Sequence, residues 1–101
     1  MTEQWGAVHE AATAVGNLAQ LGCETVAPEI AQVPAFAARK GGWHYETAAR
    51  GIGDLAAVMQ PGLRALLSLA AQGQDTTTAA LTLWREFHRA RDAIVELVAA
   101  G

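Results

Sequence analysis

Three possible metal ligands recur at a regular spacing near the end of the chain. His88, Asp92 and Glu96 follow one another at intervals of four residues, which places them on one face of a helix. Metal sites in helical bundles need ligands that converge from facing helices, often through a Glu-x-x-His motif, and the sequence contains no such motif. A closed site also needs three or four protein ligands. We therefore expect a solvated helix face here, with no bound metal or other cofactor.

No combination of residues predicts a nucleophile with its base. The single cysteine, Cys23, has no local signature of a catalytic thiol, and we expect it to be a buried structural residue. His9 and Glu10 are neighbours, so on a helix their side chains point in different directions. Gly41-Gly42 is not followed by the Lys-Ser/Thr pair of a phosphate-binding loop. We expect no catalytic residues, although the sequence leaves enzymatic activity open.

The composition excludes several classes of protein to which these residues could otherwise belong. The chain has 101 residues, of which 51% are hydrophobic and 17% charged, with a net charge of −3. Abundant apolar side chains exclude intrinsic disorder, and one cysteine excludes a disulfide scaffold. An acidic chain with seven Lys and Arg is not expected to bind nucleic acid. No apolar run is long enough to span a membrane, and the N-terminus lacks the basic residues of a secretory leader. A single thiol suits a reducing compartment, so we expect a cytoplasmic protein.

Apolar residues recur at spacings of three and four along most of the chain, which is typical of amphipathic helices. The pattern predicts helices over about 3–26, 29–40, 44–71 and 76–99. Pro28 and Pro34 are expected to break or kink the chain at the residue before each, although the first helix could continue past Pro28. Asp75 is the expected N-cap of the last helix. The fold class is therefore all-α, a small antiparallel bundle of three to four helices in a single domain over residues 1–101.

The first and last helices carry more apolar residues than one buried stripe requires. The residues outside the main stripes, together with a tryptophan that follows the glycine pair at 41–42, are candidates for a protein interface: Leu18, Leu21, Trp43, Trp84, Val95 and Val98. Arg91 lies within the apolar arc and is expected to snorkel or to pair with an acid such as Glu10 or Glu24. With so few charges to cover the surface, the leading hypothesis is a non-catalytic interaction module, acting as a homo-oligomer or as a small subunit or regulator of a larger complex. The alternative is a bundle that binds a small apolar ligand or a metal between its helices.

A chain of about a hundred residues, with long helices and a tryptophan beside glycines at Gly41-Gly42-Trp43, distantly resembles the small helical-hairpin proteins exported by ESX-type secretion. The family's turn is Trp-x-Gly, whereas this chain has the glycines first. Its C-terminal Tyr-x-x-x-Asp/Glu signal is missing, because the only tyrosine is Tyr45. The resemblance implies a third hypothesis, a secreted helical partner protein.

Overall fold

The computed structural model describes residues 1–21 and 26–99 of the chain. This part is 86% helical and has no strand, so the predicted all-α fold is confirmed. Three long helices form the bundle, and two short ones connect the first of them to the second. In chain order they are α1 (Thr2–Leu18), α2 (Pro28–Ala31), α3 (Val33–Lys40), α4 (Gly42–Ala71) and α5 (Thr77–Ala99).

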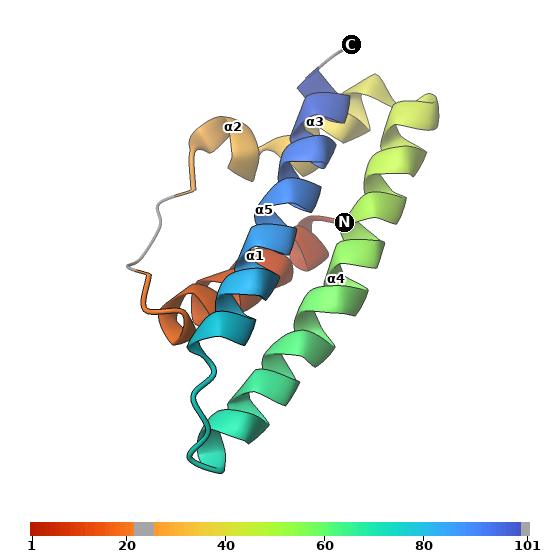
Figure 1. The fold of residues 1–101 in the computed structure, drawn as a ribbon. Coiled ribbons are helices and arrows are strands. Elements are labelled where there is room, and N and C mark those ends of the chain that lie inside the picture. Colours follow the sequence, from red (N-terminus) through yellow and green to blue (C-terminus); the bar gives the residue numbers. More distant parts are fainter. Residues whose placement is uncertain (22–25, 100–101) are drawn as a thin grey trace.

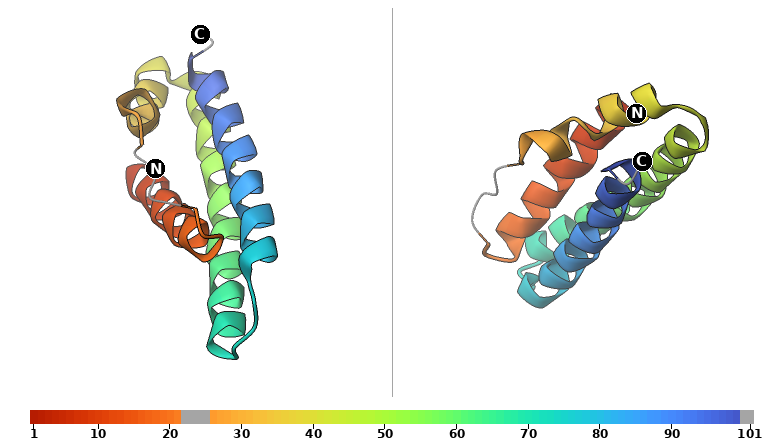
Figure 2. Two further views of the ribbon diagram at one scale, coloured as in Figure 1. Left: turned by 60° about the vertical axis from the view of Figure 1, so that its left-hand side comes forward. Right: turned by 90° about the horizontal axis from the view of Figure 1, so that it is seen from above.

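The two longest helices, α4 and α5, lie side by side in opposite directions and are joined by the turn around Gly73 (Figure 1). Helix α1 crosses this hairpin obliquely and covers only the middle of its length (Figure 2). Helix α3 packs against both α4 and α5 near the end of the hairpin where α4 begins. The molecule is elongated, with extents of 47 × 22 × 19 Å.

Helix α1 ends earlier than its apolar pattern predicts. The structure ends it at Leu18 instead of position 26, because Gln20 adopts a left-handed conformation with φ of 63°. The amide of Leu21 then donates to the carbonyl of Gly16, and the amide of Gln20 donates to that of Asn17. This is the Schellman arrangement, which usually uses glycine at the left-handed position. The rest of the predicted extension, residues 22–25 with Cys23, lies outside the described residues.

The prediction of a single helix over 29–40 is also wrong. It divides at Gln32 into α2 and α3, while Ala27 before Pro28 is extended as expected. Pro34 has no amide hydrogen, so the carbonyl of Ile30 four residues earlier loses its usual helical donor. The indole Nε1–H of the buried Trp5 donates to this carbonyl at 2.9 Å. The break therefore creates the hydrogen bond that ties α2 to α1.

Helices α4 and α5 begin and end within two residues of their predicted bounds, and α4 continues through the exposed Pro61. The predicted cap of α5 is displaced by one residue, since the first helical amide bond goes to the carbonyl of Thr76. The carboxylate of Asp75 instead accepts a hydrogen bond of 3.0 Å from the amide of Thr77. This bond favours the charged form and lowers the pKa of Asp75 below its ordinary value.

The hairpin depends on close approach at two glycines. A Cβ atom at Gly62 would lie 2.8 Å from Leu83 Cδ2, and one at Gly51 would lie 3.1 Å from Ile94 Cγ1. These two pairs also fix the antiparallel register of the helices. Gly53, by contrast, has no atom within 4 Å of the position a Cβ would take.

Replacing Gly62 by valine should therefore separate the two helices. We expect Gly62→Val to lower the free energy of unfolding by about 1–3 kcal/mol, because the branched side chain overpacks the contact with Leu83. The same change in the open space at Gly53 should leave stability close to wild type. Urea unfolding followed by circular dichroism measures both. Equal effects at the two glycines would show that the contact at Gly62 does not limit the approach of the helices.

The hydrogen bond of Trp5 can be removed while an aromatic ring is kept. We expect Trp5→Phe to cost about 1–3 kcal/mol, because it leaves the Ile30 carbonyl without its donor and reduces the volume that fills the core. The matched control is Trp43→Phe, since Trp43 is 62% exposed and its replacement should change stability by less than about 0.5 kcal/mol. A Trp5→Phe variant as stable as its control would contradict this role.

Candidate functional site

An aromatic cluster with titratable side chains lies between α1 and α5. The ring of His9 meets the rings of Trp5 and Phe87 edge to face, with centroid distances of 4.7 and 5.3 Å. His9 Nδ1 also lies 2.8 Å from the carbonyl oxygen of Trp5, one turn earlier in α1. On α5, the ring of His88 lies 5.3 Å from that of Phe87. Both histidines are therefore held by packing within the helix contact.

Arg91 lies on the same side of α5 and is 6% exposed. Its guanidinium carbon lies 5.5 Å from the centre of the Phe87 ring, and its Nη2 is 3.2 Å from His88 Nδ1. Nε and Nη2 of Arg91 also contact the carboxylate of Asp92 at 3.4 and 3.3 Å. Arg91 thus lies in the apolar arc, but it is buried and does not snorkel. Among the described residues, the acid that it contacts is Asp92, its neighbour on the same helix, and not Glu10; Glu24 lies outside the described residues.

The cluster leaves little room for a ligand. The cavity beside it is lined by residues of α1 and α5 with Val26, and its volume is about 20 Å³. This volume corresponds to about one water molecule. Within residues 1–21 and 26–99, no three His, Cys, Asp or Glu side chains lie close enough together to hold a metal ion. In the series His88, Asp92 and Glu96, the first two both contact Arg91 and the third is exposed.

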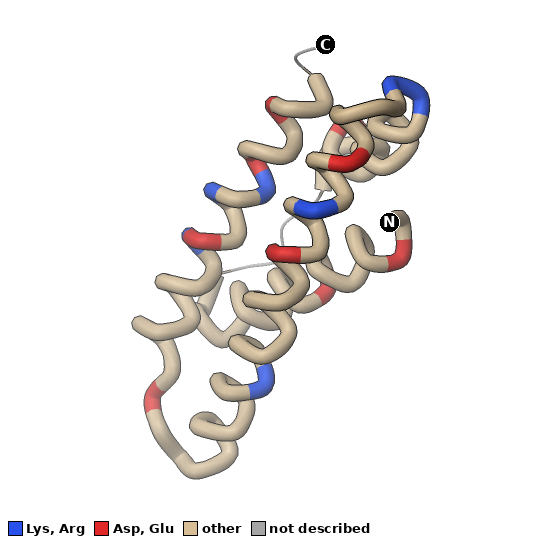
Figure 3. Tube along the Cα trace, turned by 90° about the vertical axis from the view of Figure 1, so that its right-hand side faces the viewer, with Lys and Arg blue, Asp and Glu red and all other residues tan. Residues whose placement is uncertain are grey.

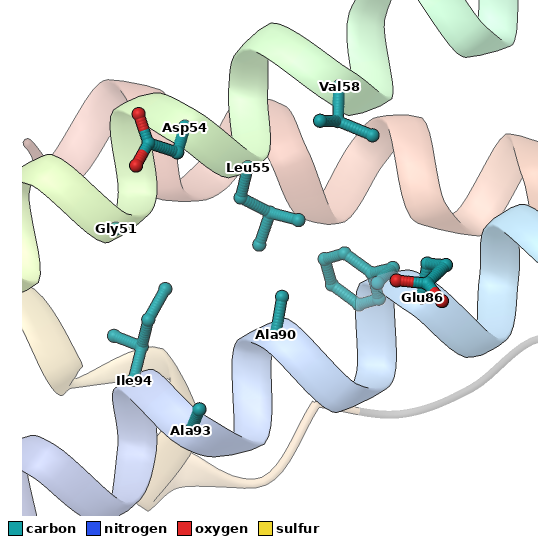
Figure 4. Close-up of a pocket in the computed structure, with 9 residues that line it drawn as sticks. Gly51, Asp54, Leu55, Val58, Glu86, Ala90, Ala93 and Ile94 are labelled. Atoms are coloured by element: carbon teal, nitrogen blue, oxygen red, sulfur yellow. The ribbon is translucent and has the colours of Figure 1, made fainter.

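The surface of α4 and α5 that faces away from α1 contains a larger hollow, which we call the outer groove. Its volume is about 370 Å³. Figure 4 shows Leu55 of α4 and Ile94 of α5 pointing into it from opposite helices, with Asp54 and Glu86 toward opposite ends. Small residues form much of the lining. The residues around the groove are Gly51, Asp54, Leu55, Val58, Glu86, Phe87, Ala90, Ala93 and Ile94.

Large apolar side chains are exposed on one helix of the described chain. All of them belong to α4: Trp43, Tyr45, Val58, Leu67 and Leu69. For Tyr45 and Leu69 the reason is a difference in length, since the 30 residues of α4 extend about 45 Å and the 17 residues of α1 about 26 Å. Tyr45 and Leu69 lie at the two ends of the apolar line of α4, beyond the part that α1 covers.

Charge is also distributed unevenly along the hairpin. Between positions 55 and 84 the sequence has only two charged residues, Arg64 and Asp75. Figure 3 shows this part as an almost uncharged end of the hairpin, whereas red and blue positions are frequent toward the other end. An exposed apolar surface with few charges is typical of a surface that another molecule covers.

Five of the six predicted interface residues pack within the chain itself. Leu18, Leu21, Trp84 and Val95 are partly buried against the core, and Val98 is fully buried. Val95 and Val98 face α3, where they line a second hollow of about 420 Å³ with Val33. Only Trp43 projects, stacked on His44 with a centroid distance of 3.7 Å. An interface role for these residues stays a prediction.

The sequence reasoning overlooked Val58 and the outer groove. The apolar pattern predicted interface residues on the first and last helices. In the structure, α3 covers Val95 and Val98 of the last helix, where a partner was expected. A signal was nevertheless present, because Val58 lies off the apolar line of its helix within the charge-poor stretch 55–84.

The burial of Arg91 can be tested on the stability of the bundle. We expect Arg91→Met to lower the free energy of unfolding by about 1–3 kcal/mol, because it removes the contacts to His88, Asp92 and the Phe87 ring. Arg89→Met is the matched control, since the Arg89 side chain is 79% exposed and its change should cost less than about 0.5 kcal/mol. Thermal and urea unfolding of the two variants give the comparison. Equal stabilities would mean that the Arg91 contacts contribute nothing to the fold.

Comparison with protein-family models, with curated proteins and with solved structures finds no match to this chain. No described helix is both long enough and apolar enough to cross a membrane.

The resemblance to helical-hairpin proteins is not strengthened by the position of Trp43. This residue opens α4 directly after the eight-residue α3, and does not lie at a turn between two long helices.

Proposed function

We propose that this protein is a non-catalytic helical interaction module that binds a protein partner through the exposed side of α4. The observation that carries the proposal is the gathering of the exposed large apolar side chains on this one helix. Val58 is 53% exposed beside an apolar groove, and Leu69, eleven residues or about three turns further along the helix, is 40% exposed on the same side. Covering such side chains contributes about 25 cal/mol for each Å² removed from water.

The total surface supports the same proposal. The chain exposes 5998 Å². A monomer of 10.6 kDa typically exposes about 5,500 Å². The difference follows from the elongated shape, in which the hairpin extends beyond α1 (Figure 2). A partner packed along the hairpin would bury this additional surface.

The charge of the surface favours a protein partner over nucleic acid. The chain carries a net charge of −3, and Arg64 is the one cation between positions 55 and 84. Nucleic-acid binding needs clustered lysines and arginines that neutralise phosphates. The single thiol, Cys23, suits a reducing compartment, and we place the module in the cytoplasm.

The position of the titratable groups supports a non-catalytic role. His9 and Arg91 border a cavity of about 20 Å³ within the α1–α5 contact, where a substrate has no room beside them. A catalytic acid or base must reach its substrate within hydrogen-bond distance. In the outer groove the ionisable groups are Asp54 and Glu86, and Glu86 is already paired with Arg89 at 2.6 Å.

A second candidate function is the binding of a small apolar molecule in the outer groove. Its volume of about 370 Å³ lies at the lower end of the range for ligand pockets, about 300–1,000 Å³. Its lining is mainly apolar. The groove is open along one side, however, which fits an extended partner surface better than an enclosed ligand.

Capture of partners from an extract of the source organism tests the proposed function. We expect the wild-type protein to retain a protein, another copy of itself included, in near-stoichiometric amount. The double variant Val58→Glu with Leu69→Glu should lose it, because two charges then stand on the same exposed side of α4. The control, Ala35→Glu with Ala38→Glu, places the same charges on exposed positions of α3 and should retain it. Capture that the α4 variant leaves unchanged, or no capture at all, would contradict the proposal.

A further inference from the structure

We propose that the hollow between α3 and α5 binds a small amphipathic carboxylate, with its apolar chain in the hollow and its charged head on Arg39 and Lys40. The inference goes beyond the proposed function, because this hollow is lined by residues of α2, α3 and α5 and by none of the exposed apolar side chains of α4. Three observations carry it: the volume of the hollow, its apolar lining and the two cations beside that lining.

The hollow has the volume and the lining of a site for an acyl chain. Its volume is about 420 Å³, within the range of about 300–1,000 Å³ that is usual for small-molecule sites. Val33 and Val98 form the buried part of the lining, and Phe36 and Val95 are only partly buried by the chain itself. Phe36 and Val95 therefore keep apolar surface in contact with water. An apolar chain in the hollow would remove this surface from water, which favours binding.

The sequence of α3 explains why the space stays open. Three of its eight residues are alanine, and its largest side chain on the hollow is Phe36. The helix also ends after Lys40, because Gly41 adopts a left-handed φ of 62°. Helix α3 therefore packs on α5 without filling the space beside Val95 and Val98.

Arg39 and Lys40 place positive charge on the lining, although the whole chain is acidic. They are the only two consecutive cations in the sequence, and no acid occurs between Glu29 and Glu46. Within the described residues, no carboxylate oxygen lies within 4.0 Å of the charged nitrogens of either side chain. The one acid of the lining is Glu29, so two cations and one acid give the hollow a net charge of +1. This balance suits a ligand with a single negative charge.

The guanidinium of Arg39 is already positioned over the apolar lining. Its central carbon lies 4.6 Å from the centre of the Phe36 ring. This cation–π contact holds the charged group at the boundary between the apolar surface and water. A guanidinium presents two parallel N–H donors that match the two oxygens of a carboxylate. An acyl chain that covers Phe36 would therefore place its carboxylate beside donors of matching geometry.

Isothermal titration calorimetry of the full chain with decanoate, kept below the concentration at which it forms micelles, tests the ligand class. We expect one decanoate to bind per chain. Acetate has the same head without the apolar chain and should bind at least about tenfold more weakly, because it leaves the hollow filled with water. Decyltrimethylammonium has the same apolar chain with a cationic head, and it should also bind at least about tenfold more weakly.

Two charge variants test the role of the cations. Arg39→Gln with Lys40→Gln should weaken decanoate binding by about tenfold or more, because hydrogen bonds to charged groups are the stronger ones. The control, Arg64→Gln with Arg85→Gln, removes the same charge at exposed positions elsewhere and should bind decanoate as wild type does. Circular dichroism verifies that both variants are folded.

Two volume variants test the location. Val95→Phe fills part of the hollow and should weaken decanoate binding by about tenfold or more, since the chain then has less room. Ala93→Phe adds bulk at an exposed position of the outer groove and should leave the affinity unchanged.

The outcomes decide each part of the inference. Absence of decanoate binding overturns the site, and equal binding of decyltrimethylammonium or an unaffected Arg39→Gln with Lys40→Gln variant overturns recognition by the cations. Decanoate binding that Val95→Phe leaves unchanged overturns the hollow as its location. Val58→Glu with Leu69→Glu should bind decanoate as wild type does, so the failure of this inference and the failure of the proposed function are distinguishable.

Discussion

The close antiparallel contact of α4 and α5 is the constraint on which the rest of the molecule depends. It exists because Gly51 and Gly62 carry no side chain, so the side chains of Ile94 and Leu83 pack directly on the backbone of α4. With the hairpin fixed in this register, one of its faces becomes the platform for α1 and α3. The opposite face keeps a groove between the two helices, into which Leu55 and Ile94 point. The core and the outer groove therefore lie on opposite faces of the same pair of helices, α4 and α5.

The second determinant is the short length of α1. The left-handed residue Gln20 ends the helix after 17 residues, and the chain then returns through α2 and α3 along the upper part of the hairpin (Figure 1). The hydrogen bond from Trp5 to the Ile30 carbonyl holds this return in place. The two ends of α4 remain beyond the reach of α1, and there the apolar line of the helix meets solvent. A longer first helix would have covered more of this line, but not Val58, which lies on the face turned away from α1.

The parts of the fold that depend on local patterns could be predicted from the sequence. Helices α4 and α5 follow their apolar periodicity to within two residues, and the extended Ala27 follows from Pro28. The end of α1 could not be predicted, because glutamine seldom occupies a left-handed cap and gives no stop signal. The packing of α3 over Val95 and Val98 could not be predicted either. Periodicity shows that a helix has an apolar face, but not which other segment of the chain packs against that face. For the same reason the sequence directed attention to those valines, whereas the structure exposes Val58.

The central claim is that a protein partner covers the outer face of α4, where Val58 is exposed. Methyl resonances in nuclear magnetic resonance report this at one side chain. Val58 lies on the exposed face and Val8 is fully buried in the core, so Val8 serves as an internal reference. When the labelled chain is transferred from dilute buffer to an extract of the source organism, we predict that the Val58 methyl shifts change while those of Val8 stay constant. Val58 shifts that are the same in dilute buffer and in the extract would contradict the account.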